Sequence, residues 1–152
     1  MTGERVPFPY LESPFEEAHA QFSPDGKWVA YTSNESGRSE VYVQSFPIGG
    51  GKWQVSNNGG DQPQWRSDGK ELFYIAPDRN LMAVSVEGTA TLAIGRPEAL
   101  FQTLMPLSGI TDDRNNYVPS KDGQRFLVNM LADTTNSQPL ILVLNWAGEI
   151  KR

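Results

Sequence analysis

The stretch that decides the fold is FSPDGKWVAY at residues 22–31. Its pattern returns as WRSDGKELFY at residues 65–74 and, in a weaker form, as PSKDGQRFLV at residues 119–128. The Asp-Gly pairs of the three copies lie 43 and then 54 residues apart. Self-similarity at such a period is typical of proteins that use one structural unit several times. The chain therefore consists of three related units.

Each copy centres on an Asp-Gly pair that predicts a tight turn. Gly26 accepts a positive φ at no steric cost, Asp25 bonds to nearby backbone, and Pro24 presets φ for the first turn position. The flanking residues are rich in Val, Tyr, Phe and Trp, which favour strands. No segment shows a convincing helical period. We therefore expect antiparallel hairpins and an all-β chain.

Each hairpin is followed by a polar loop and a third strand, and in two copies by a fourth, outer strand. The first interval, 43 residues, matches the roughly 40–45 residues of one four-stranded propeller blade, and the second matches a blade with a longer loop. The expected second strands are Trp28–Ser33, Glu71–Ala76 and Arg125–Leu131, the third are Glu40–Phe46, Asn80–Glu87 and Pro139–Trp146, and the fourth lie around Lys52–Ser56 and Glu98–Gln102.

Residues 7–13 are the candidate for the outer strand that the third copy lacks. The segment Pro7–Phe15 resembles Pro97–Met105 in its pattern and in its position before a first strand. Prolines at positions 7 and 9 suit an edge strand, which needs few backbone donors. The alternative is an extension without a strand. The predicted organisation is an outer strand at 7–13, a first blade at 16–56, a second at 61–104 and a third, without its own outer strand, at 114–147.

Composition excludes several classes of protein. The 152 residues include 18 acidic and 13 basic side chains, a net charge of -5, which argues against a protein that binds nucleic acid. Without cysteine there is no disulfide, thiol nucleophile or cysteine zinc site. No apolar run approaches the roughly 20 residues of a membrane helix, and the N-terminus lacks a signal-peptide pattern. We expect no membrane insertion, no metal and no cofactor.

The three motifs resemble the WD-like propeller repeats of the TolB type, in which Ser-Pro-Asp-Gly-Lys opens each blade, as at residues 23–27. They resemble in particular the propeller at the C-terminal end of certain bacterial serine/threonine kinases, over roughly residues 5–150. The resemblance implies an extracytoplasmic region of a bacterial membrane protein. The kinase motifs themselves are absent. Pro119 and Lys121 depart from the pattern, so the first strand of the third blade is expected to pack less well or to shift its register.

A segment of three four-stranded blades is expected to need more blades, because typical propellers close with four to eight. Two bare blade faces would expose apolar surface of a size that is rare on soluble monomers. We expect two copies to close a six-bladed homodimer, with the N-terminal strand of one completing the last blade of the other. The alternative is half of a longer single-chain propeller. The aromatic residues expected partly on the bare faces are Phe22, Trp28, Tyr31, Trp65, Phe73 and Tyr74.

The remaining loops are the candidate binding sites, because long loops of compact domains are often functional. Arg38, Arg79 and Arg114 are expected to present positive charge at the mouth of the central channel, and Asp112 and Asp113 lie in the longest loop. The expected occupant of this site is a protein or a small ligand.

Catalytic constellations are absent from the sequence. His19 is the only histidine, no nucleophile elbow accompanies it, and a structural or solvated role is expected. The adjacent carboxylates Glu16-Glu17 and Asp112-Asp113 are expected to be solvated rather than to face each other across a sugar. The sequence therefore predicts a non-catalytic binding or protein-interaction module, a sensor or scaffold. The alternatives are a propeller domain of a larger hydrolase- or kinase-associated enzyme and an assembly fragment without ligand.

Overall fold

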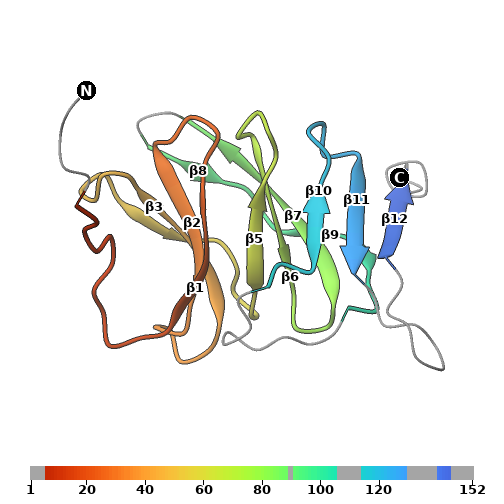
Figure 1. Cartoon of the computed structure of the whole chain (residues 1–152), viewed down its shortest axis with the longest axis horizontal. Helices are drawn as coiled ribbons and strands as arrows, with labels where there is room; N and C mark the ends of the chain where they lie inside the picture. The colour runs from red at the N-terminus through yellow and green to blue at the C-terminus, as the bar shows by residue number, and fades with distance from the viewer. Residues whose placement is uncertain (1–5, 89–90, 106–113, 130–139, 145–152) are drawn as a thin grey trace.

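The computed structural model describes residues 6–88, 91–105, 114–129 and 140–144. Within these residues twelve strands form three antiparallel sheets that follow one another in a row (Figure 1). The described residues contain no helix, and therefore none that could cross a membrane. The all-β prediction is confirmed. The first sheet contains β1 (Glu17–Phe22), β2 (Trp28–Ser33), β3 (Glu40–Ser45) and β4 (Lys52–Gln54); the second contains β5 (Asp61–Trp65), β6 (Glu71–Ile75), β7 (Asn80–Glu87), β8 (Ala93–Ile94) and β9 (Glu98–Gln102); the third contains β10 (Tyr117–Pro119), β11 (Arg125–Asn129) and β12 (Leu140–Leu144).

Apart from the strand expected at residues 7–13, the expected strands form in the expected order, and β2, β7 and β9 have the predicted bounds. One strand was not predicted. The two-residue β8 pairs with the end of β7, at Val86 and Glu87, while β9 pairs with the beginning of the same strand. Because β7 is eight residues long, its two halves have room for two separate partners.

Three turns of the same shape line one edge of the row, the upper edge in Figure 1, which we call the turn edge. In each turn the glycine N–H donates to the carbonyl three residues earlier, over 2.9 Å. Each aspartate also accepts the N–H of the residue two positions later, at 3.0 to 3.1 Å. The Asp-Gly prediction is therefore confirmed in all three copies. The glycines are Gly26, Gly69 and Gly123, with φ of 70°, 71° and 69°.

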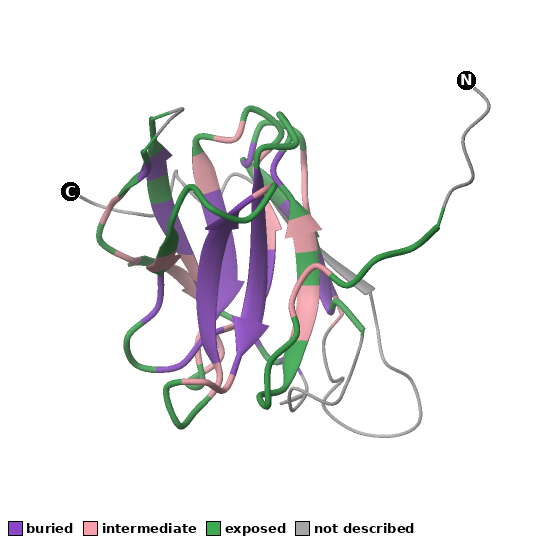
Figure 2. Ribbon diagram, turned by 90° about the vertical axis from the view of Figure 1, so that its left-hand side faces the viewer, coloured by how far each residue is buried: buried purple, intermediate pink, exposed green. Residues whose placement is uncertain are grey.

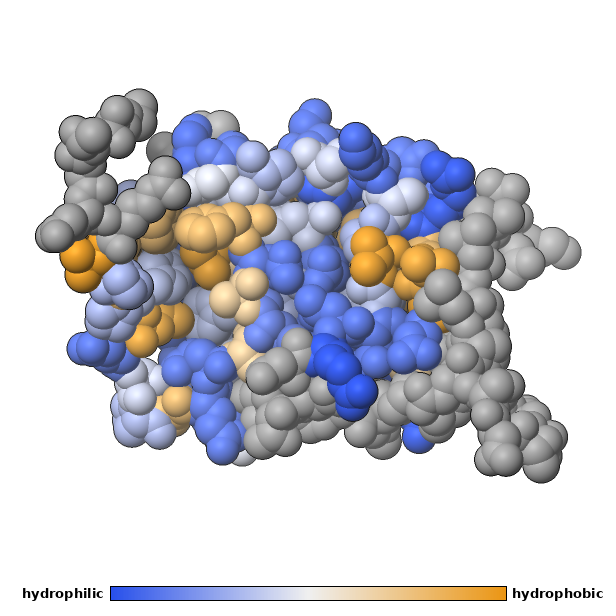
Figure 3. All heavy atoms as spheres, in the orientation of Figure 1, coloured by the Kyte–Doolittle hydropathy of each residue, from blue (hydrophilic) through white to orange (hydrophobic). Residues whose placement is uncertain are grey.

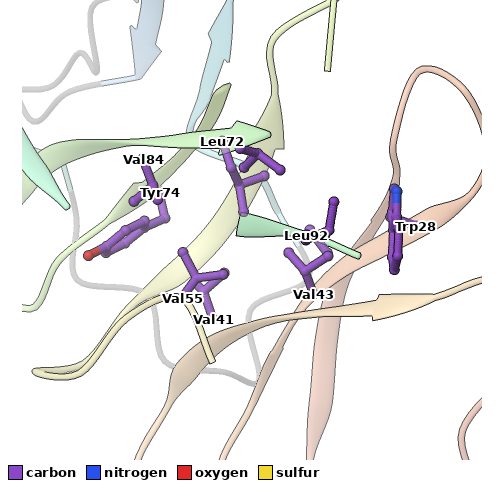
Figure 4. Packing of buried hydrophobic residues seen from close by; sticks show 10 residues of the cluster. Trp28, Val41, Val43, Val55, Leu72, Tyr74, Val84 and Leu92 are labelled. Carbon is purple, nitrogen blue, oxygen red and sulfur yellow. The ribbon is translucent and has the colours of Figure 1, made fainter. Parts of the chain in front are cut away.

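The core lies between neighbouring sheets and follows the alternation of the strands. Trp28 and Ala30 of β2 face the second sheet and belong to one cluster with Leu72 and Tyr74 of β6. Figure 4 shows Trp28, Leu72 and Tyr74 in this cluster. The intervening residue Phe73 faces the third sheet instead. The cluster between the second and third sheets consists of Phe73, Ile75, Leu81, Ala83, Met105, Tyr117, Phe126 and Val128, with Leu100 and Phe101 packed against it.

The first sheet has a second apolar side, which faces away from the second sheet. Val29, Tyr31 and Tyr42 lie on it and are buried. Figure 2 looks at the molecule from this side and shows no further sheet in front of these strands. The prediction that Trp28, Trp65, Phe73 and Tyr74 lie partly on bare faces is wrong, because they pack in the clusters between neighbouring sheets. Tyr31 does lie on the outward side, but it is only 1 % exposed, and Tyr10 and Leu11 of the N-terminal segment pack against its cluster. Phe22 is 57 % exposed.

The N-terminal segment covers part of this side of the first sheet. Within this single chain residues 6–16 form no strand, and β1 begins at Glu17. The Tyr10 hydroxyl donates to the carbonyl of Ser45 at 2.8 Å, and its ring lies 5.6 Å from that of Phe46. Leu11 packs against the same cluster. The predicted strand at 7–13 remains a prediction for an assembly, because its expected neighbour is another copy.

Candidate functional site

Arg38 lies at the edge opposite the turns, the lower edge in Figure 1, which we call the loop edge. Its Nε donates to Glu40 Oε1 at 2.7 Å, and its guanidinium also donates to the carbonyl of Asn57. The arginine therefore holds the β4–β5 loop against the start of β3. This is a structural role that the sequence analysis did not assign to it.

Glu40 explains why Arg38 is held in this way. Its carboxylate is fully buried, and a buried carboxylate is stable only when it is paired and hydrogen-bonded. Besides Arg38, it accepts the N–H of Gly59 at 2.9 Å and the hydroxyl of Ser56. The polar start of β3 thus anchors the loop that leads into the second sheet.

Arg79 also lies at the loop edge, but in the second sheet. Its φ is 68°, and its carbonyl accepts both the N–H and the hydroxyl of Thr103 at 2.9 Å. Its backbone thereby fixes the chain after β9, while no ion pair of its guanidinium is found among the described residues. Arg114 is exposed, and Asp112 and Asp113 lie outside the described residues. The predicted site is therefore placed only in part, on separate sheets.

Polar contacts join neighbouring sheets at or near their first strands. His19 Nδ1 in β1 lies 2.9 Å from Asp61 Oδ1 in β5, and the Thr32 hydroxyl donates to the same carboxylate oxygen at 3.1 Å. The His19 side chain is fully buried. Gln62 Oε1 in turn accepts the N–H of Asn116 at 2.7 Å. The contacts support the structural role expected for His19. The Thr32 hydroxyl bonds to the Asp61 carboxylate rather than to the His19 imidazole. Thr32, His19 and Asp61 therefore do not form a relay of nucleophile, base and acid.

A cavity of about 350 Å³ lies on the outward side of the first sheet, and we call it the flank cavity. Its walls are mostly apolar and come from the N-terminal segment, β1 and β2. Its polar lining residues are Glu17, His19, Tyr10 and Tyr31. A cavity with mostly apolar walls suits an apolar side chain rather than a charged ligand. The lining residues are Tyr10, Leu11, Glu17, Ala18, His19, Ala20, Val29 and Tyr31.

A second cavity, of about 410 Å³, lies at the turn edge between the first and second sheets. Ser23 and Gly69 face it from neighbouring turns. At the equivalent place between the second and third sheets, the stem of Arg66 lies against Gly123, and a Cβ at Gly123 would come 2.8 Å from Arg66 Cδ. The guanidinium of Arg66 pairs with Asp68 and Glu71. Ser23 and Arg66 occupy the same position in their repeats. The cavity therefore lies where the first repeat has a serine in place of the arginine of the second.

Comparison with known proteins connects this geometry to solved structures. No protein-family model matches the chain, and no curated protein matches it. The crystal structure of TolB from Acinetobacter baumannii matches with a TM-score of 0.56 over 83 % of this chain, at 19 % identity. The fold is TolB-like. The chain spans 29 % of the length of that TolB structure, and at this identity the match shows the fold alone.

In this TolB-like fold the flank cavity is the feature that the sequence analysis missed. A bare blade face that carries Tyr31 was expected, but the sequence does not show that Val29, Tyr31 and the N-terminal segment leave a cavity on that face. The repeat alignment was the available signal, because it places Val29 and Tyr31 at the positions of Phe126 and Val128. Those two residues pack against the preceding sheet, so the matching positions of the first sheet call for a similar neighbour. The described residues contain no group of three His, Cys, Asp or Glu side chains that could hold a metal ion.

Proposed function

We propose that the chain is a non-catalytic protein-interaction module that completes a β-propeller with a second copy of itself. Each copy contributes its three sheets as three blades of a six-bladed ring. The observation that carries the proposal is the open row of sheets (Figure 1). One end face of this row carries exposed apolar side chains, and the other carries the mostly apolar flank cavity.

The third sheet presents the apolar surface at one end of the row. Val118 of β10 is paired with Leu127 of β11, and opposite residues of an antiparallel pair face the same side. These side chains are 55 % and 38 % exposed. Figure 3 shows hydrophobic spheres in the region of β10 and β11, apart from those at the N-terminal end of the row. A face of this kind favours a partner, because burying its apolar area releases water.

Ring closure supports the choice of a second copy as the partner. Typical propellers close with four to eight blades, so three sheets fall short and six fall inside the range. A two-fold ring would join the third sheet of each copy to the first sheet of the other, which leaves no sheet face open.

The wider setting of this module belongs to the same proposal. The repeat motifs at residues 22–31 and 65–74 support attachment to a larger signalling protein, such as a bacterial serine/threonine kinase with an extracytoplasmic propeller. There the ring would act as a sensor or scaffold. In this setting the loop edge, which carries Arg79 and Arg114, would be the side that meets a protein or small ligand.

Size-exclusion chromatography with light scattering tests the proposal on the chain as it stands. We expect a mass close to twice 16.9 kDa at micromolar concentration, together with a circular dichroism spectrum of a folded β protein. A folded particle that keeps the mass of one chain at all concentrations would refute closure by a second copy. Particles of indefinite size would refute a closed ring.

A further inference from the structure

The packing between the second and third sheets provides a template for the flank cavity. Aligning the repeats on their Asp-Gly pairs places Ala20, Val29 and Tyr31 at the positions of Tyr117, Phe126 and Val128. The first three line the flank cavity, whereas the other three belong to the packed cluster between the second and third sheets. The same positions therefore meet a preceding sheet in one case and an empty space in the other.

The template also shows which side chain occupies this space. Phe73 of β6 packs its ring on Phe126, with the ring centroids 5.0 Å apart and the rings nearly perpendicular. Phe73 is fully buried there. In the alignment Phe126 corresponds to Val29, and Phe73 corresponds to Leu127 of the third sheet. Leu127 is 38 % exposed in the single chain.

The N-terminal segment follows the same template. Leu100 and Phe101 of β9, the outer strand of the second sheet, pack against the cluster formed with the third sheet, and Phe101 lies 5.7 Å from the Phe126 ring. Tyr10 and Leu11 align with these two residues and pack against the outward side of the first sheet. Residues 7–13 thus lie beside the first sheet as the outer strand of a preceding sheet would.

We propose that the flank cavity is the docking site for Leu127 of a second copy, and that residues 7–13 add to the third sheet of that copy as its outer strand. This inference rests on the proposed ring and specifies its interface. Two features of the chain itself select a second copy. The third sheet carries an apolar residue at the position of Phe73, and within the described residues it has no fourth strand.

The two faces meet as unlike surfaces, so the contact occurs twice in a two-fold dimer. Val118 lies next to Leu127 on the same side of the third sheet and extends the apolar contact. Asn129 stands at the position of Ile75, so this interface is more polar than its template at that point. Glu17 lines the cavity and would lie close to any charge placed at position 127.

Glutamate substitutions on both sides of the contact test this inference. Leu127→Glu and Ala20→Glu each place a carboxylate in the contact, and we expect each to raise the dimer dissociation constant at least tenfold. Ile48→Glu is the matched control: Ile48 is also exposed and apolar, but it lies in the β3–β4 loop at the turn edge. We expect it to change the constant less than twofold. The double variant Leu127→Glu/Ala20→Lys should recover part of the lost affinity, because the introduced charges attract each other across the interface.

Each result bears on one of the two proposals. A folded wild-type monomer would refute the proposed ring itself. A wild-type dimer whose dissociation constant is unchanged by both Leu127→Glu and Ala20→Glu would refute this interface and leave the ring standing. If Leu127→Glu loses its folded circular dichroism spectrum, Ala20→Glu decides alone, since exposed Ala20 lies in β1 and not in the third sheet.

Discussion

Gly26 and Gly123 occupy the same position in two turns whose backbones are nearly identical, with φ of 70° and 69°. Their surroundings differ. A Cβ at Gly26 would have no atom within 4 Å, whereas a Cβ at Gly123 would lie 2.8 Å from Arg66 Cδ and 3.1 Å from Phe73 Cζ. Gly26 is therefore required for its conformation alone. Gly123 is required for its conformation and also because a side chain there would collide with Arg66 and Phe73 of the second sheet.

We expect Gly26→Ala to reduce the free energy of unfolding by about 1 kcal/mol, the usual cost of a left-handed φ for a residue with a Cβ. Gly123→Ala should cost about 1–3 kcal/mol more, because the Arg66 stem and the Phe73 ring must shift. Urea unfolding of both variants measures the difference. Equal losses of unfolding free energy in the two variants would show that Arg66 and Phe73 can move away from residue 123 without an energetic cost.

At the scale of an element, the start of β3 depends on the buried carboxylate of Glu40 and its partner Arg38. The two side chains differ in solvent exposure: that of Glu40 is 1 % exposed, whereas that of Arg38 is 58 % exposed. Removing the arginine leaves a charge in the interior, whereas removing the carboxylate leaves a cation that can turn into water.

We therefore expect Arg38→Met to destabilise the protein by about 3 kcal/mol or more, and Glu40→Gln to cost less. Urea unfolding of the two variants and of the double variant gives the coupling energy between the side chains. Our structural assignment of Arg38 fails if Arg38→Met leaves stability unchanged.

The strands illustrate how far sequence reasoning extends. Turn chemistry and strand propensity are local, so the Asp-Gly pairs predicted β2, β6 and β11 within two residues of their observed ends. The two-residue β8 escaped prediction because it exists only through its pairing with β7.

The candidate site was less predictable than the strands. Arg38 was assigned to ligand binding because a sequence does not show that the nearby Glu40 is buried and requires a partner. The flank cavity was missed because it depends on which neighbour a sheet lacks. Burial and neighbours are set by the whole fold and cannot be read from any local pattern.

At the scale of the whole molecule, buried tyrosines limit stability at high pH. Burial raises the pKa of Tyr10 and of Tyr74 to about 12. Burial also raises the pKa of Tyr31 and that of the fully buried Tyr117. In an unfolded chain tyrosine has a pKa of about 10. The unfolded state therefore releases protons first, and this part of the stability is complete below pH 10 and lost as the pH rises through 10 towards 12.

We expect thermal stability to be insensitive to tyrosine ionisation up to about pH 9.5 and to fall steeply above about pH 11. Absorbance at 295 nm, which follows phenolate formation, should then rise together with the loss of the circular dichroism signal. If all tyrosines ionise near pH 10 while the fold persists, their burial does not resist ionisation as inferred.

The two edges of the row differ in a way that bears on recognition. One edge repeats a single shape three times, with an ionised aspartate and a left-handed glycine in each turn, and hydrogen bonds lower the pKa of Asp25, Asp68 and Asp122. The opposite edge is irregular, with the Glu40 anchor in one sheet and the Arg79 backbone contact in the next. A molecule approaching the turn edge would meet the same backbone turn three times, with differences confined to side chains such as Ser23 and Arg66. At the loop edge the backbone itself differs from sheet to sheet, so sequence can change there without disturbing the turns.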